Sequence, residues 1–271
     1  MRNNAWKYEG VQVMDVLKPK IRADKNIKMG ITLRKFKMLG AFMMMLSAFS
    51  APVIPHLFGG LRKDNMLALT FAVICEVVSW TALPWYAWIL MRGYHNTHNV
   101  NLYILRLLIL AIICEVPYDL TTSGCAFDLR SQNPVFALVI ALFVLMGIDM
   151  VRERFSGFLR SVAYAAVVIA GLLWNIIGKV YVRQQIFWGG ALFLVFVLIF
   201  ELMQKHEIRM ELISGMFGAM SMLAPGIGVA VLHYRSPYGD GHKDSPVFRW
   251  TMYAWYPVML AIAALFAVFV K

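Results

Sequence analysis

Long apolar runs recur along this chain, and no other feature restricts its fold as strongly. An α-helix needs about 20 mostly apolar residues to cross the hydrocarbon core of a bilayer. The sequence has 60% apolar residues, 15% charged residues and a mean hydropathy of +0.65, which is outside the range of soluble globular proteins. Eight apolar stretches lie at roughly 38–58, 66–91, 102–117, 134–150, 161–177, 184–203, 213–232 and 252–270. We therefore predict an all-α membrane protein with about eight transmembrane helices in one bundle.

The alternative membrane architecture, a β-barrel, is excluded by the pattern of these stretches. A barrel strand has about ten residues that alternate in polarity, and runs such as "ALFLVFVLIF" do not alternate. The connecting segments are short, and there is no internal repeat and no second soluble domain. The predicted domains are therefore a basic N-terminal arm at 1–37 and a polytopic membrane domain at 38–271.

The distribution of basic residues predicts the orientation. The segment 1–37 holds 10 basic and 3 acidic residues, so it supplies +7 of the formal charge of +11. By the positive-inside rule, both termini and the loop at 92–100 should be cytoplasmic, and the loop at 121–133 should face outward. The arm has neither the apolar core of a signal peptide nor the aromatic-interleaved basic surface of a nucleic-acid site, so we expect it to lie on an anionic leaflet.

Ionisable residues within or beside apolar helices are costly in lipid and usually face a bundle interior or a polar cavity. Such residues here are His56, Glu76, Arg106, Glu115, Asp119, Asp149, Glu201 and His233. Glu76 lies deep in its apolar segment and needs a partner from another helix. The three cysteines are not spaced as a metal site, and a disulfide framework is not expected.

The segment "CEVPYDL" combines two acids with a helix breaker at an expected helix end. Pro117 removes a backbone donor and disfavours helical geometry at Val116, so the helix should end or kink there. Non-helical backbone at this depth is tolerated only against protein or a water-filled cavity. We interpret Glu115 and Asp119 as the wall of an outward-facing polar pocket; the alternative is a capped helix end with the acids among the headgroups.

The turn "RGYHNTHN" is dense in hydrogen-bond donors on the expected cytoplasmic face. It precedes Arg106 and carries Arg92, His95 and Thr97 beside a glycine. Such a loop can hold an anionic group such as a phosphate. An ordinary polar turn with glycine and asparagine has the same composition.

These residues resemble the TraX family, membrane proteins named for the acetylation of F-pilin. The similarity covers residues 83–120, the run "QNPVFALVIAL" at 132–142 and "YAWYPVMLAI" at 253–262. In the family, a Gly-aromatic-x-x-Thr turn is followed by Arg-Leu, a Glu-x-Pro-(Phe/Tyr)-Asp helix exit and Gln-Asn. The matching residues here are Gly93, Thr97, Arg106, Glu115, Pro117, Asp119, Gln132 and Asn133.

The resemblance implies an eight-helix relative of transmembrane acyltransferases, which transfer acetyl from cytoplasmic acetyl-CoA to an acceptor, in TraX an N-terminal amine. Acetyl-CoA would then be the co-substrate, bound by Arg92, His95, Thr97 and Arg106. The candidate catalytic residues are Glu115, Asp119 and His56 in the outer pocket, where carboxylates would attract a cationic amine and influence its proton.

Two departures from the family pattern bear on activity. Family members usually carry an Asp-His pair in the first helix, where this chain has Ala48-Phe49, and a His two residues after the last Tyr-Pro, where it has Met259. His56 is the local candidate for a substitute base, although two helical turns place it about 10 Å nearer the exterior; the alternative is an interfacial histidine.

Two hypotheses of different class follow. The chain is either a diverged TraX-like acyltransferase with an amine or peptide acceptor, or a non-catalytic relative that binds a ligand or a partner membrane protein. Gly215 and Ala219 allow close helix packing, either with a partner or within the bundle. A transporter is a weaker third hypothesis because no inverted repeat supports it. The expected location is the inner, or plasma, membrane of a bacterium, crossed several times.

Overall fold

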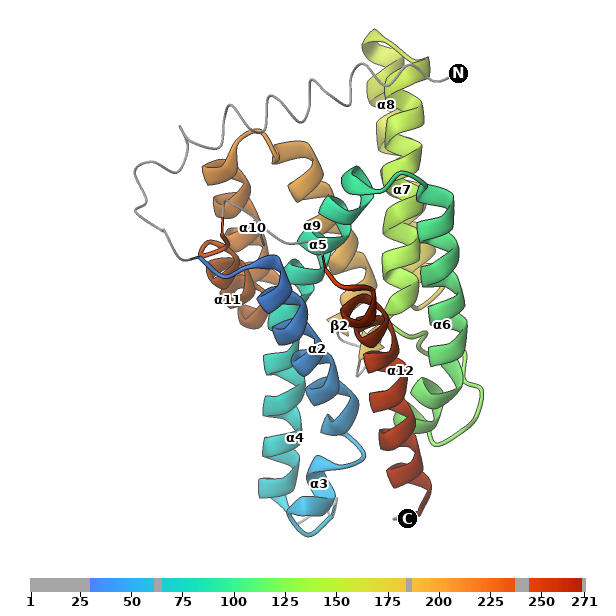
Figure 1. Cartoon of the computed structure of the whole chain (residues 1–271), viewed down its shortest axis with the longest axis vertical. Coiled ribbons are helices and arrows are strands. Elements are labelled where there is room, and N and C mark those ends of the chain that lie inside the picture. Colours follow the sequence, from blue (N-terminus) through green and yellow to red (C-terminus); the bar gives the residue numbers. More distant parts are fainter. Residues whose placement is uncertain (1–29, 61–64, 184–186, 237–243, 270–271) are drawn as a thin grey trace.

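The computed structural model describes residues 30–60, 65–183, 187–236 and 244–269, which form a bundle of helices (Figure 1). The expected basic arm lies mostly outside the described residues. Helix α2 (Leu33–Ser50) begins before the expected boundary at residue 38, and the Thr32 side chain accepts from the backbone N–H of Lys35 at its start. The first predicted span is broken, because α2 is followed by the single turn α3 (Ile54–Leu57), which carries Pro55.

The second predicted span is one long helical unit with a local change of geometry. Helix α4 (Met66–Ser79) continues through the 3₁₀ turn η2 (Trp80–Ala82) into α5 (Leu83–Asn96). Pro84 has no backbone N–H to give to the carbonyl four residues earlier, so the backbone tightens directly before it. This unit reaches from one end of the bundle to the other (Figure 1).

Helix α6 (Val100–Thr122) corrects the prediction that the third span ends near Pro117. The helix continues for five residues past the proline. Hydroxyl groups hold this last turn: Thr122 Oγ1 donates to the carbonyl of Tyr118 (2.9 Å), and Ser123 Oγ donates to that of Asp119 (2.9 Å). These bonds satisfy carbonyls at the C-terminal end of the helix, which have no partner within it.

The middle of the chain forms three further helices. Helices α7 (Val135–Arg154) and α8 (Gly157–Ile177) are antiparallel neighbours. A two-residue pair of antiparallel strands, β1 (Val182–Arg183) and β2 (Phe187–Trp188), leads into α9 (Gly189–Met203). Helices α7 and α9 are largely buried and form the centre of the bundle, whereas most of α8 is exposed.

The seventh predicted span, 213–232, is wrong as a single crossing. The structure has a hairpin of two short helices, α10 (Glu207–Ser221) and α11 (Leu223–Leu232), which meet at the extended residue Met222. At 1.5 Å per residue they are about 22 and 15 Å long, and neither crosses a core of about 30 Å. A Cβ on Gly218 would lie 2.8 Å from the backbone nitrogen of Gly226, so glycine lets the two helices pack closely.

The hairpin changes where the chain ends. Helix α12 (Pro246–Phe269) runs parallel to α2. Lys37 pairs with Asp244 where the two helices begin, and the rings of His56 and Phe266 lie 5.6 Å apart where they end. Leu33 and Phe269 therefore lie at opposite ends of the bundle, because the hairpin returns the chain without crossing. The prediction that both termini share a face is not confirmed, and residues 1–29 and 270–271 lie outside the described residues.

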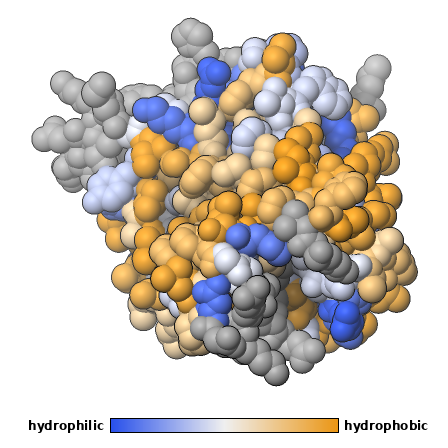
Figure 2. All heavy atoms as spheres, turned by 90° about the horizontal axis from the view of Figure 1, so that it is seen from below, coloured by the Kyte–Doolittle hydropathy of each residue, from blue (hydrophilic) through white to orange (hydrophobic). Residues whose placement is uncertain are grey.

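The structure supports a polytopic membrane protein, but not the exact count of eight crossings. Five helical units are long and apolar enough to cross a membrane: Met66–Asn96, Val100–Thr122, Val135–Arg154, Gly157–Ile177 and Pro246–Phe269. Seen from below, the described surface is largely apolar, with hydrophilic residues gathered in a few patches (Figure 2). Such a surface is expected where lipid surrounds a helical bundle.

We call the end where α2 and α12 begin the basic end, and the other the opposite end. Helices α5, α7, α9 and α11 finish at the basic end. Arginines from five helices and from the turn after α11 gather there: Arg34, Arg92, Arg152, Arg209, Arg249 and Arg235.

Candidate functional site

A buried carboxylate at the basic end lies between two nitrogen-bearing side chains. Glu201, near the end of α9, has a side chain that is 1% exposed. Its Oε2 lies 2.6 Å from His95 Nε2, and its Oε1 accepts from Arg152 Nη1 at 3.0 Å. Because an ionised carboxylate only accepts hydrogen bonds, His95 donates from Nε2 to Glu201.

The same group extends to two neighbouring helices. Arg152 Nη1 also donates to Asp149 (3.2 Å), one turn earlier on α7, and its Nε donates to the hydroxyl of Tyr164 on α8 (2.8 Å). Tyr94 donates from its hydroxyl to Asp149 at 2.7 Å. The last turns of α5, α7 and α9 thus bring together charges that are far apart in the sequence.

This arrangement leaves one reactive side chain accessible. The His95 side chain is 36% exposed, whereas the Glu201 side chain beneath it is buried. An imidazole whose orientation and tautomer are fixed by a buried carboxylate is suited to accept a proton from a reacting group. The group can therefore act as a general base at the surface of the basic end.

The four residues predicted to hold a coenzyme do not form one group. Arg92 lies with its guanidinium 5.3 Å from the Trp88 ring, and Thr97 ends α5 in an extended conformation directly after the turn that carries His95. Arg106 is exposed and acts electrostatically on Tyr253 of α12. The structure therefore keeps Arg92 and His95 on the last turns of α5 with Thr97 directly after them, whereas Arg106 lies on the next helix, α6.

Gly93, which carries part of the family resemblance, has a packing role. A Cβ there would lie 3.1 Å from the hydroxyl of Tyr103. A larger side chain would push this tyrosine away from α5, so glycine permits the close approach of α5 and α6.

At the opposite end, Glu115 supports the start of α7. Its Oε2 accepts from the side-chain nitrogen of Asn133 (2.5 Å) and from the backbone N–H of the same residue (3.2 Å). Asn133 is fully buried, and it also donates to the carbonyl of Ala111 and accepts from the N–H of Val135. These bonds connect α6 to the first turn of α7.

Asp119 is likewise engaged with the loop between α6 and α7. It is 1% exposed, and its Oδ2 accepts from the backbone N–H of Asp128 at 2.8 Å. Its Oδ1 is buried with no hydrogen-bond partner among the described residues. Neither Glu115 nor Asp119 borders the cavity beside Ser47 or the one beside Trp188, and the polar pocket stays a prediction.

His56 lies apart from both carboxylates. It is exposed, its Nδ1 is 2.9 Å from the carbonyl of Pro52, and its ring packs against Phe266. Within the described ranges, no hydrogen bond or ion pair joins His56 to Glu115 or Asp119. The three predicted catalytic residues therefore share an end of the bundle without forming one site.

The position of the family's Asp-His pair is filled by packing. Ala48 is buried in a small apolar cluster with Cys114, Tyr118, Tyr256 and Leu260. Phe49 packs against this cluster. The place where relatives carry a base is therefore an apolar contact between α2, α6 and α12.

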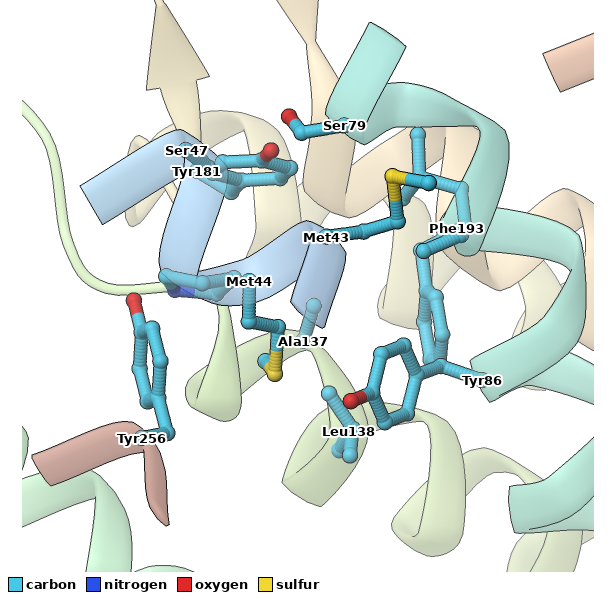
Figure 3. A pocket seen from close by; sticks show the side chains of 13 residues that line it. Met43, Met44, Ser47, Ser79, Tyr86, Ala137, Leu138, Tyr181, Phe193 and Tyr256 are labelled. Carbon is cyan, nitrogen blue, oxygen red and sulfur yellow. The ribbon is translucent and has the colours of Figure 1, made fainter. Parts of the chain in front are cut away.

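The deeply placed Glu76 has the partners that its position requires. Ser47 and Ser50 of α2 donate to its Oε2 at 3.0 and 2.8 Å, and the indole N–H of Trp80 lies 3.3 Å from its Oε1. Ser47 also borders a cavity of about 50 Å³ in the bundle interior. Figure 3 shows Met44 and Tyr86 pointing into this cavity toward Ala137 and Leu138, so the cavity is mostly apolar.

Three members of the basic-end group were not predicted. Arg152, Tyr94 and Tyr164 look like ordinary interfacial residues in the sequence, since each lies near the end of an apolar run. Asp149 and Glu201 were recognised as ionisable but had no predicted partner. The Glu201–Arg152 pair spans 49 residues, and no local pattern indicates it.

Comparison with known proteins agrees with the motif at residues 83–142. The sequence model of the TraX family, described as TraX protein, matches residues 38–267. No curated protein and no solved structure matches the chain. Because the family match covers most of the sequence and nearly all of the described helices, this membrane protein belongs to the TraX family.

Proposed function

We propose that this protein is a membrane acyltransferase whose reacting groups meet at the basic end. One observation carries the proposal: the accessible His95 side chain has its Nε2 2.6 Å from Oε2 of the buried Glu201 carboxylate. The abundance of arginines at this end supports a cytoplasmic orientation by the positive-inside rule. A cytoplasmic donor such as acetyl-CoA would then reach the site directly.

The proposed reaction needs one proton acceptor and one acyl donor. The nitrogen of a neutral acceptor amine attacks the thioester carbonyl, the carbon–sulfur bond breaks, and the coenzyme leaves as its thiolate. His95 takes the proton that the amine nitrogen loses on acylation and returns it to the thiolate. Glu201 positions the imidazole, and Arg152 keeps Glu201 ionised.

The basic end suits this task better than the opposite end. Glu115 and Asp119 accept hydrogen bonds that organise the loop between α6 and α7, and His56 contacts neither. Arg92 and Thr97 flank His95 and are the candidates for contacts with the anionic part of the donor. Arg106 is not included in the proposed site because it lies on α6 and makes no hydrogen bond or ion pair with the His95 group among the described residues.

Turnover measured with purified protein tests this proposal. The assay follows release of coenzyme thiol from acetyl-CoA with a small peptide amine as acceptor. His95→Gln should lower the rate by roughly 10² to 10⁴, the usual effect of losing a general base. His98→Gln is the matched control, because His98 is exposed three residues away and has no hydrogen bond among the described residues. Equal loss in both variants would contradict the assignment.

Glu201 needs a separate readout because it acts through His95. Glu201→Gln should change the pH dependence of the rate, since the imidazole loses its ionised partner. A variant that merely folds poorly would lose rate at all pH values with an unchanged profile. Acetyl-CoA binding by calorimetry should survive in both the His95 and Glu201 variants.

A second candidate function is a non-catalytic TraX-like subunit. The apolar cluster around Ala48, which occupies the position of the family's Asp-His pair, favours it. This hypothesis predicts no binding of acetyl-CoA and the copurification of a partner membrane protein. Saturable acetyl-CoA binding together with His95-dependent turnover would eliminate it.

A further inference from the structure

One buried tryptophan near the basic end contacts three parts of the chain. The guanidinium of Arg92, one turn later on α5, lies 5.3 Å from the centre of the Trp88 ring. The guanidinium of Arg235, in the turn after α11, lies 5.6 Å from the same ring, and the ring of Phe36 on α2 lies 6.3 Å away. Trp88 is itself buried. It therefore joins α2, α5 and the end of the hairpin at one place.

Arg235 is fixed by the hairpin to which it belongs. Its Nη2 donates to Glu207 at 2.6 Å, and its Nη1 donates to Glu211 at 2.8 Å and to the carbonyl of Leu232 at 3.1 Å. The Arg235 side chain is only 7% exposed. Because two carboxylates already neutralise this guanidinium, it is poorly suited to binding an anionic ligand. Its contact with Trp88 instead helps to hold the ring in place.

The ring in turn restricts the side chain of Arg92. A guanidinium within about 6 Å of an indole ring is attracted by its π electrons. A long arginine side chain loses many rotamers when it binds a ligand, and a contact that restricts the side chain beforehand lowers this cost. Trp88 therefore preorganises Arg92, provided that the ring itself cannot move.

Trp88, Arg92 and His95 lie on one face of α5. They are spaced as i, i+4 and i+7, which places side chains on the same side of a helix. At 1.5 Å per residue, Arg92 is about 6 Å and His95 about 10 Å beyond Trp88 along the helix axis. Arg92 thus lies between the fixed ring and the accessible imidazole.

From this arrangement we propose that Trp88 is a positioning residue for the acyl donor. It holds the Arg92 guanidinium in the orientation that contacts the anionic part of acetyl-CoA, while Arg235 and Phe36 hold Trp88. The inference rests on the proposed function, because it concerns the donor side of the same site. It also gives the hairpin of α10 and α11 a part in donor binding that requires no contact between the hairpin and the donor.

Two donors tested on the full-length protein in detergent separate this role from general packing. Acetyl-CoA is compared with acetyl-pantetheine, which has the same thioester but no phosphate. Trp88→Phe should weaken acetyl-CoA binding roughly threefold to tenfold, because a phenyl ring attracts a cation less than an indole does. Acetyl-pantetheine should be unaffected. In turnover the loss should appear in KM with kcat preserved, since His95 and Glu201 are unchanged.

A double-mutant cycle shows whether the ring acts through Arg92. In an Arg92→Gln background, Trp88→Phe should cause no further loss of acetyl-CoA affinity, because the cation that the ring positions is gone. If Trp88→Phe weakens binding equally with and without Arg92, or weakens both donors equally, the proposal is overturned.

Trp85→Phe is the matched control. Trp85 is a buried tryptophan one turn earlier on α5; its indole N–H donates to the carbonyl of Gly228 at 2.8 Å, and its ring lies 5.7 Å from that of Phe36. The variant should lower the melting temperature but leave the affinity for acetyl-CoA unchanged. An equal loss of affinity in Trp85→Phe and Trp88→Phe would contradict the positioning role.

The wild-type protein separates failure of this inference from failure of the proposed function. If it neither binds acetyl-CoA nor turns it over, both are overturned. If it binds and Trp88→Phe binds equally tightly, only the positioning role is overturned.

Should Trp88→Phe not fold, Arg235→Lys decides. Lysine keeps a positive charge beside Glu207 and Glu211 but lacks the planar group that packs on the ring. Arg235→Lys should weaken acetyl-CoA binding only where Arg92 is present. Unchanged affinity in this variant would contradict the proposal.

Discussion

The two ends of the bundle stabilise buried carboxylates in different ways. At the basic end, Glu201 lies between His95 and Arg152, so a buried negative charge faces charged or chargeable groups. At the opposite end, Glu115 and Asp119 accept hydrogen bonds from an asparagine side chain and from backbone amides. A carboxylate with amide partners organises a loop, whereas one paired with an accessible histidine can also take part in proton transfer.

The prominence of a carboxylate in the sequence does not indicate which of these two roles it has. Glu115 and Asp119 stand in a conspicuous motif but connect α6 to the loop and to α7. Glu201 ends an otherwise apolar helix, and its importance follows only from the residues that it meets. The functional difference therefore lies in the partners of each carboxylate.

The largest effect on stability is expected at the basic end. Arg152→Gln removes the cation beside the buried Glu201 and should destabilise the fold by about 3 kcal/mol, toward the low end for a buried pair that loses one partner, since Arg152 is partly exposed. Thermal or SDS-induced unfolding of purified protein measures it. Arg154→Gln, two residues away and exposed, should change stability little. Equal losses of stability in Arg152→Gln and Arg154→Gln would show that the buried Glu201 carboxylate is not stabilised by Arg152.

The hairpin that brings Arg235 back to the basic end can be disturbed at one glycine. A Cβ on Gly228 would lie 2.1 Å from the backbone oxygen of Thr81. Gly228→Ala should force α11 away from η2 and cost about 2 kcal/mol, a typical cost of overpacking. Gly215→Ala is the control, since its Cβ would lie 3.8 Å from the Val229 side chain. If both variants are equally stable, the hairpin does not pack against η2 as described.

At the opposite end, the amide network should contribute less. Asn133→Ala leaves the carbonyl of Ala111 and the N–H of Val135 without their side-chain partner, at a cost of about 1–2 kcal/mol. The unfolding assay used for Arg152 provides the measurement. Gln132→Ala should be nearly neutral, because the Gln132 side chain makes no hydrogen bond within the described ranges. If Asn133→Ala lost more stability than Arg152→Gln, the opposite end and not the basic end would contribute more to stability.

The smallest effect concerns the loop between α6 and α7. The Arg130 guanidinium, which bonds the carboxylate of Asp128, lowers the pKa of that group to about 2. A lowered folded-state pKa stabilises above the unfolded value, near pH 4, and this stabilisation is lost as the pH falls toward 2. Arg130→Gln should therefore reduce stability slightly at neutral pH, with the difference from wild type disappearing in acid. Unfolding followed between about pH 2 and 6 measures it; a difference that grows in acid would contradict the pairing.

The sequence alone determined that the protein lies in a membrane, that its fold is all-helical and that it belongs to the TraX family. Apolar runs of about 20 residues specify membrane helices because unsatisfied backbone groups are costly in lipid, and the motif from Gly93 to Asn133 indicated the TraX family. The sequence also required a partner for Glu76, which the serines of α2 provide.

Tertiary structure decided the topology and the candidate site. The run 213–232 is apolar enough to be taken for one crossing, and only the close contact of Gly218 with Gly226 shows that it turns back. Helix α6 continues past Pro117 to Thr122, and hydroxyl groups bond the carbonyls of its last turn. The His95–Glu201–Arg152 group depends on contacts between residues 49 to 106 positions apart in the sequence. Such contacts form only where particular helices pack side by side, and the local periodicity of the sequence does not indicate which helices do so.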